Sequence, residues 1–375
     1  MASQTIRKYD YIDALRGIAI ALVVLVHASQ TVKPVSDTLL RLMNEGARGV
    51  QLFYIASAIT LCLSWNARRS TDRAPVRDFY LRRLFRIAPM FYLAILMFLF
   101  LNGTAASYFA PNGISWWFVP VTALFLHGFH PETINSVVPG GWSIAVEMTF
   151  YLVFPLLVRV RKIGYLSLLF VASLCLQKFN VPLSGAIFHY EANQKYLIEG
   201  FAFFNFIGQL PVFLLGMMTY WMIAGQRAID YKFVVLAAVA FVGLLVEFWV
   251  PHQTFIASHV VAGGLFALFS VFLARVPLAL VVNRVTILLG KLSFSMYLVH
   301  IAILKLLAGS RVVALFGEGN LGSIAFFAFV LALTAGVSWI TYHLIEKPGI
   351  ALGRRLIDRL EEVRGADELS PKIIK

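Results

Sequence analysis

The stretch IDALRGIAIALVVLVHASQ, residues 12–30, decides the class of fold. As a single α-helix it is long enough to cross a hydrocarbon layer about 30 Å thick. Within it, Arg16 and His27 are eleven residues apart, and eleven helical steps return to within about 20° of the starting direction. The two side chains therefore share one face of the helix, about 16 Å apart along its axis.

This pair has two interpretations. Ionisable side chains inside a membrane are costly, so they usually face a cavity or a partner and mark a functional path. On that interpretation a cation lies near one membrane surface and an imidazole lies deeper in the same segment. Alternatively, Arg16 anchors the helix at the interface and His27 is a satisfied polar residue inside a helix bundle.

The composition extends the membrane interpretation to the whole chain. Of its 375 residues, 59% are hydrophobic and only 14% are charged, whereas about 25% are charged in a soluble domain. The two cysteines lie in apolar segments, so we expect neither a disulfide nor a thiolate metal site. We predict an all-α, polytopic transmembrane helix bundle with ten spans, near residues 12–30, 48–65, 87–103, 142–158, 163–178, 201–224, 233–250, 256–274, 285–308 and 322–345.

The basic residues are distributed unequally between the two sides of these spans. With a cytoplasmic N-terminus, 23 Lys and Arg residues fall on the inside and six on the outside. Cytoplasmic loops of membrane proteins carry such an excess. Both termini are therefore predicted to be cytoplasmic, and the net charge of +13 needs no nucleic-acid partner.

Two segments do not fit the regular spans. Residues 114–129 are apolar but short, and counting them as a span would invert every later loop, so we expect an interfacial or re-entrant segment. Eleven spans are the alternative. We divide the chain into a transmembrane domain, 1–345, and a basic cytoplasmic tail, 346–375, in which residues 351–364 have the pattern of an amphipathic helix lying on the inner membrane surface.

Polar residues near the outer ends of the spans suggest a catalytic site. Glu147 is predicted about 9 Å below the outer end of its span, at the depth of His27. A carboxylate there could orient the imidazole while its free nitrogen takes a proton from an alcohol. The alternative is a neutral Glu147 that only joins two helices. His300 also falls in the outer half, either near an acceptor or as a buried structural histidine.

Arginines at the cytoplasmic side suggest an anion site. Arg82 and Arg86 are one helical turn apart, with Arg83 beside them, and could bind phosphate groups bidentately. Ordinary positive-inside charge is the alternative. Because Arg16 begins the helix face that leads to His27, we expect a phosphorylated donor whose reactive end reaches toward that histidine.

Six motifs in this order make the chain resemble the acyltransferase-3 family of membrane acyltransferases over nearly its whole length. The motifs are Tyr11-Ile12-Asp13-Ala14-Leu15-Arg16-Gly17-Ile18-Ala19 followed by His27, Gly49-Val50-Gln51-Leu52-Phe53-Tyr54-Ile55-Ala56-Ser57, Arg82-Arg83-Leu84-Phe85-Arg86-Ile87-Ala88-Pro89, Trp142-Ser143-Ile144-Ala145-Val146-Glu147-Met148-Thr149-Phe150-Tyr151, Leu289-Gly290-Lys291-Leu292-Ser293-Phe294-Ser295-Met296-Tyr297-Leu298-Val299-His300 and Ile345-Glu346-Lys347-Pro348. Two positions depart from the family's pattern. Gln51 stands where an acidic residue is common, and Ser57-Ala58 stands where Ser-Gly is common.

The resemblance implies transfer of an acyl group, usually acetyl from cytoplasmic acetyl-CoA, to a hydroxyl of an envelope glycan. The acceptor would be a glycan or lipid-linked glycan, such as a surface polysaccharide or lipopolysaccharide. Acyl-CoA is then a co-substrate, and we expect no bound cofactor or metal. It also implies a multi-pass protein of the bacterial inner membrane, in contact with membrane lipid.

The resemblance further implies that His27 is essential and that Arg16, Arg82, Arg83 and Arg86 contact the donor. We expect the acceptor site to include Trp142, Ser143, Tyr297 and His300. Many relatives carry an extracytoplasmic hydrolase-like domain after the membrane domain. Because this sequence ends soon after its last predicted span, we expect the protein to act alone or with a separate periplasmic partner. A transporter or flippase for a glycan or organic anion is the alternative, because the same polar groups could line a transport path.

Overall fold

The protein is described by a computed structural model that covers residues 9–225, 231–249 and 256–369. These residues form helices and loops, and their β structure is limited to one isolated bridge between Ser107 and Ala110. The all-α prediction is confirmed. The predicted inner connection at 226–230 and the last tail residues, 370–375, lie outside the described residues, as does position 250 at the end of one predicted span.

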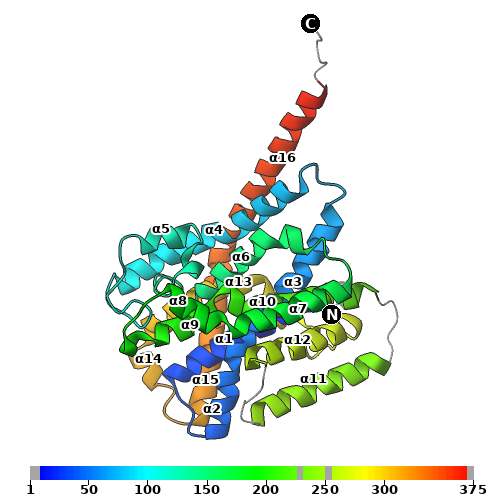
Figure 1. Cartoon of the computed structure of the whole chain (residues 1–375). Helices are drawn as coiled ribbons and strands as arrows, with labels where there is room; N and C mark the ends of the chain where they lie inside the picture. The colour runs from blue at the N-terminus through cyan, green and yellow to red at the C-terminus, as the bar shows by residue number, and fades with distance from the viewer. Residues whose placement is uncertain (1–8, 226–230, 250–255, 370–375) are drawn as a thin grey trace.

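Each of the ten predicted spans coincides with a helix (Figure 1). These helices are α1 (Asp10–Thr31), α3 (Gly49–Arg68), α4 (Pro75–Asn102), α6 (Trp142–Leu157), α7 (Ile163–Lys178), α10 (Phe206–Gly225), α11 (Tyr231–Trp249), α12 (Ser258–Arg275), α13 (Arg284–Leu307) and α15 (Asn320–Thr341). The connections contain shorter helices, namely α2 (Asp37–Asn44), α5 (Phe118–Ala123), α8 (Asn180–Ile187), α9 (Tyr196–Phe204) and α14 (Arg311–Ala314). A final helix, α16 (Lys347–Leu369), follows α15.

Fewer than ten of these helices are both long enough and apolar enough to cross a membrane. In the described residues, α1, α3, α4, α10, α12, α13 and α15 lie in the 7 helical runs that meet both conditions. The pair α7 and α8, bent by 51°, could be an eighth span. The apolar parts of α6 and α11 are shorter, at 10–17 residues. The chain is a multi-pass helical membrane protein, and the number of ten spans stays a prediction.

The segment 114–129 forms only the six-residue helix α5 and a 3-10 turn at His127–Phe129. Six helical residues extend about 9 Å, which is too short to cross the hydrocarbon layer. Trp116, just before α5, is 85% exposed, as expected of a tryptophan at headgroup level. The geometry agrees with an interfacial or re-entrant segment rather than an additional span.

Two glycines let α1 and α13 approach until their backbones touch. A Cβ atom on Gly17 would lie 2.0 Å from the carbonyl oxygen of Thr286, and one on Gly290 would lie 1.8 Å from that of Asp13. Small residues permit such close crossings in membrane bundles, where apolar lipid gives helices little hydrophobic reason to associate. The helices run parallel, because Asp13 meets Gly290 at one end and the His27 ring lies near His300 at the other.

The remaining helices pack around this pair. Helix α3 packs against α1, next to α13. At this contact a Cβ on Gly49 would lie 2.5 Å from the Ala19 carbonyl oxygen. In turn α10 packs on α3, where a Cβ on Gly216 would lie 2.7 Å from that of Ala58. Helix α16 packs against α4 and extends beyond the bundle (Figure 1).

The contact at Gly290 predicts the effect of adding a single methyl group. In Gly290→Ala the new Cβ overlaps the Asp13 carbonyl, so α1 and α13 must separate. We expect the free energy of unfolding to fall by about 1–3 kcal/mol, measured in detergent from intrinsic fluorescence on heating. Gly336→Ala is the matched control, since its Cβ meets nothing within 4 Å and alanine favours a helix. Equal stability of the two variants would contradict the packing argument.

Candidate functional site

Three linked cavities run through the bundle, and we name them after the predicted topology. The inner cavity, of about 400 Å³, and the outer cavity, of about 390 Å³, both adjoin a central cavity of about 70 Å³. Arg16, Arg83 and Arg86 line both the inner and the central cavities. Val50 and Tyr297 line both the central and the outer cavities. A narrow point near the middle therefore separates two spaces, each large enough for part of a substrate.

The inner cavity contains the arginines predicted at the start of α4. Arg82 pairs with Asp72, with its Nη2 2.7 Å from Oδ2. The Arg83 guanidinium lies 5.7 Å from the centre of the Phe79 ring, and its buried Nε has no hydrogen-bond partner. Both arginines line the same cavity as Arg16. The structure thus brings together the cations that the sequence placed on two separate helices.

The other two arginines at this level have weaker partners. Arg86 Nη1 lies 3.8 Å from Oε1 of the fully buried Glu346, whose other oxygen accepts a hydrogen bond from Ser295. Arg16 donates to Thr60 Oγ1 at 3.0 Å and lies 3.7 Å from Asp13. Both guanidinium groups retain N–H donors beyond these contacts, so they can bind an anion in the cavity.

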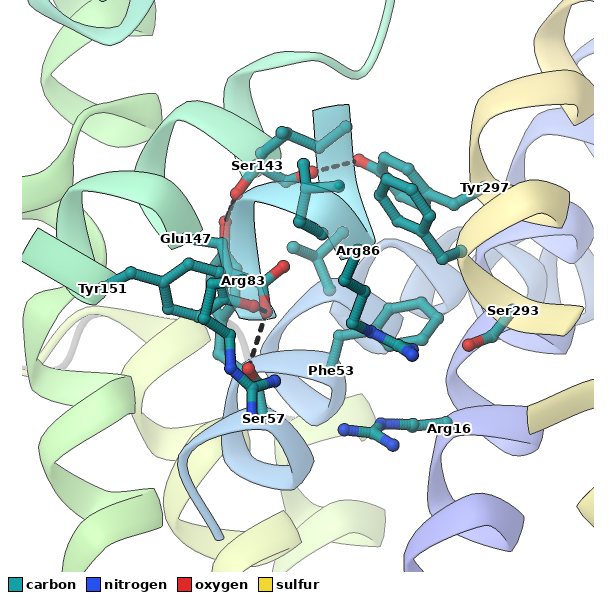
Figure 2. Close-up of a pocket in the computed structure, with 15 residues that line it drawn as sticks. Arg16, Phe53, Ser57, Arg83, Arg86, Ser143, Glu147, Tyr151, Ser293 and Tyr297 are labelled. Atoms are coloured by element: carbon teal, nitrogen blue, oxygen red, sulfur yellow. Dashed lines mark hydrogen bonds between the residues drawn. The ribbon is translucent and has the colours of Figure 1, made fainter. Parts of the chain in front are cut away.

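The central cavity is formed around Glu147 (Figure 2). Its Oε1 accepts hydrogen bonds from Ser57 Oγ at 2.6 Å and from the Tyr151 hydroxyl at 2.5 Å. Two donors on one oxygen suit an ionised carboxylate. One turn earlier on the same helix, Ser143 donates to the Tyr297 hydroxyl at 2.8 Å, and Tyr297 donates to the Gly140 carbonyl at 3.0 Å. These bonds connect α3, α6 and α13 around the narrow part of the path.

The outer cavity contains both candidate histidines. Their ring centroids lie 5.3 Å apart. His27 Nδ1 lies 3.2 Å from the Gln30 amide oxygen, and His300 Nδ1 lies 3.2 Å from the Met296 carbonyl oxygen. Facing oxygen acceptors, both Nδ1 atoms carry the proton, which leaves each Nε2 as an acceptor. The Nε2 of His300 is buried without a hydrogen-bond partner.

The structure does not bring Glu147 and His27 together: they line different cavities and have different hydrogen-bond partners. Trp142, at the start of α6, lines the outer cavity with His27, whereas Glu147 lines the central cavity. Five residues along a helix extend about 7 Å. The predicted depth of Glu147 requires α6 to begin at the outer surface. Pro139 and Gly140, just before α6, line the outer cavity instead, so α6 begins inside the bundle. Glu147 instead joins α6 to α3 through Ser57.

Several functional contacts were absent from the sequence argument. Gln30 is three residues after His27 and Tyr151 is four after Glu147, so helical spacing could have identified both. Glu346 depends on tertiary packing, since it meets Arg86 from a distant helix. The departure at Gln51 is compensated locally, because its amide donates to Gln209 at 3.1 Å and both residues are buried.

The bonds to Glu147 predict which hydroxyl matters for stability. Tyr151→Phe removes one donor to a carboxylate, and we expect the free energy of unfolding to fall by about 1–3 kcal/mol. In Thr149→Val, the matched control, the lost hydroxyl bonds only to Ala145 in its own helix, so stability should change little. Thermal unfolding of both variants in detergent tests this prediction. If both variants lose the same free energy of unfolding, the Tyr151–Glu147 hydrogen bond does not stabilise the fold.

Comparison with known proteins agrees with this geometry. A family described as an acyltransferase domain matches residues 9–343. A Staphylococcus aureus strain COL protein named "Putative O-acetyltransferase" is 22% identical over 91% of this chain and 58% of its own. The O-acetyltransferase OatA of S. aureus strain NCTC 8325 is 23% identical, over 90% of this chain and 56% of its own. The chain thus spans little more than half the length of these relatives. No solved structure matches it. The chain belongs to the acyltransferase-3 family.

Proposed function

We propose that this protein is an integral-membrane O-acyltransferase of the bacterial inner membrane. It moves an acyl group, most simply acetyl, from cytoplasmic acyl-CoA to a hydroxyl of an extracytoplasmic acceptor, a cell-surface polysaccharide. One observation carries the proposal: linked cavities join an arginine cluster at one end to a pair of imidazoles at the other. The names of the O-acetyltransferase relatives support acetyl as the group.

The inner cavity suits the phosphate groups of the donor. Guanidinium groups bind phosphate with two parallel hydrogen bonds and stay charged when partly buried. Arg16, Arg83 and Arg86 line both the inner and the central cavities, so they border the passage between them. The phosphates would remain with these arginines while the thioester arm extends past them toward the outer cavity.

His27 is the proposed catalytic base. Gln30 holds its Nδ1–H, so Nε2 can take the proton of the acceptor hydroxyl as that oxygen attacks the thioester carbonyl. The C–S bond then breaks, and the leaving thiolate takes the proton from the imidazolium to become the free thiol. In a two-step route, Nε2 attacks the thioester carbonyl and the C–S bond breaks, which gives an acyl-imidazolium and the thiolate. The acceptor hydroxyl then attacks the acyl carbon, the N–C bond breaks to restore His27, and the hydroxyl proton goes to the thiolate.

Glu147 takes a different role from the one that the sequence suggested. Its carboxylate lines the same cavity as Arg16, Arg83 and Arg86, where it balances part of their positive charge. Held by Ser57 and Tyr151, it would position the arginines around the thioester arm. It acts on the donor side of the reaction, and His27 acts on the acceptor side.

The outer cavity suits a carbohydrate acceptor. Aromatic side chains line it beside amide and imidazole groups, which is typical of sites that contact the faces and the hydroxyls of a sugar. Tyr297 and Ser143 fix the wall between the outer and central cavities. The acceptor-site residues and nearby aromatics in this lining are Trp142, Phe203, Phe204, Tyr297 and His300.

A complementation experiment tests the function directly. A deletion strain is complemented with wild type or with His27→Ala, and envelope glycans are analysed by mass spectrometry and proton NMR. A general base contributes about 100-fold or more, so the O-acyl signal should return with wild type only, at equal protein levels. Substantial O-acylation by His27→Ala would refute the base assignment.

The same data separate transfer from transport. A path between the two faces also fits a transporter or flippase, which moves its ligand unchanged and forms no ester. Glycans altered in amount or location but equal in ester content would support transport and contradict the proposal.

The position of His300 in the lining of the outer cavity predicts a role in acceptor binding. We expect His300→Phe to lower kcat/KM for the acceptor about tenfold, because the wall of the acceptor site loses a polar group, while the donor KM is unchanged. His343→Phe is the matched control, since His343 makes the same bond to the carbonyl four residues earlier but lies outside the three cavities. A kcat/KM equal to wild type would assign His300 to structure alone.

A further inference from the structure

Helix α16 is packed tightly against α4 through a pair of glycines. Gly349 and Gly353 are four residues apart and face α4. A Cβ on Gly349 would lie 2.7 Å from Pro89 Cγ, and one on Gly353 would lie 2.6 Å from Phe85 Cβ. Small residues at this spacing allow close helix contact. The beginning of α16 is therefore fixed beside the part of α4 that carries the arginines.

A second contact holds α16 farther along. Glu361 Oε1 accepts a hydrogen bond from the Arg73 backbone N–H at 3.3 Å, and the Arg73 guanidinium donates to the Glu361 carbonyl at 3.2 Å. Arg73 lies in the loop between α3 and α4. Held at both places, α16 is packed on the protein from Gly349 to Glu361.

Between these two contacts, α16 forms one side of the inner cavity. It contributes Ile350 and Ile357 as apolar lining, with Arg354 and Asp358 as charged lining. Arg355, the next residue, is described but does not line the cavity. The helix thus directs one of two adjacent arginines toward the cluster on α4.

The charge of the cavity favours an anion. Six arginines line it, against three carboxylates, and two of those carboxylates have partners, Asp72 with Arg82 and Glu361 with Arg73. The six arginines are Arg16, Arg68, Arg82, Arg83, Arg86 and Arg354. Asp13 and Glu346, outside this lining, also contact Arg16 and Arg86, but the arginines in the lining still outnumber its carboxylates two to one, so the cavity attracts an anion.

We propose that α16 is a wall of the donor site and that Arg354 binds a phosphate group in the nucleotide half of acyl-CoA. This inference rests on the proposed function, because the donor supplies the ligand's chemistry. The thioester must pass Arg16 to reach His27, so the bulky nucleotide stays in the inner cavity, where α16 faces it. The α16 contact at Arg354 adds a phosphate-binding residue to the arginines of α4.

The test measures binding by the full chain in phosphatidylcholine nanodiscs, which contain no anionic lipid to occupy the site. Coenzyme A and 3′,5′-ADP are titrated by calorimetry against wild type, Arg354→Gln and the matched control Arg355→Gln. Loss of one charge-assisted hydrogen bond to phosphate corresponds to about a tenfold weaker Kd. We expect this loss for both probes in Arg354→Gln, with Arg355→Gln within about twofold of wild type and equal thermal stability of all three.

The failures are distinguishable. If Arg354→Gln binds both probes with the Kd of the wild type, the inference is overturned and the proposed function remains intact. Equal weakening in both variants would also overturn it, because general attraction to a basic helix would explain the result. Wild-type binding of neither probe would overturn the proposed donor and the inference together.

Discussion

The backbone contact between α1 and α13 is the constraint on which the rest of the site depends. Lipid is as apolar as the helices, so close packing, rather than release of water, holds the bundle together. Gly17 and Gly290 allow that packing. Ten residues farther along each parallel helix lie His27 and His300, so the register set by the glycines brings the two imidazoles to the same depth.

The polar groups that remain inside the bundle are distributed unevenly along the path. Most of the lining arginines gather at the inner cavity, Glu147 lies in the narrow centre beside three of them, and the two imidazoles lie in the outer cavity with Arg48. Carboxylates accompany the arginines, as Asp72 does for Arg82, because an unpaired charge in a poorly hydrated site is costly. This order fits the proposed function, in which a phosphorylated donor binds at one end and a hydroxyl is activated at the other.

The narrow central cavity limits the passage of water and ions between the two larger cavities, although each of these can receive a molecule from its own side of the membrane. A cavity of about 70 Å³ holds only a few water molecules, each occupying about 30 Å³. It lies between two spaces several times larger. Long arginine side chains border it. In the proposed reaction they would change rotamer to admit a thin thioester arm while the packed helices stay in place, and the larger parts of the two proposed substrates would remain on their own sides.

The sequence by itself determined the helical class, the position of each long helix and the shared face of Arg16 and His27. These follow from apolar length and from the helical repeat, which are local properties. It also placed Arg82, Arg83 and Arg86 together, because they share one helix. Only the tertiary structure decided that Glu147 bonds to Ser57 and that His300 lies beside His27. Local periodicity gives the direction of a side chain around its own helix but not the depth at which that helix begins. Depth and register are decided where helices touch, at Gly17 and Gly290 above all.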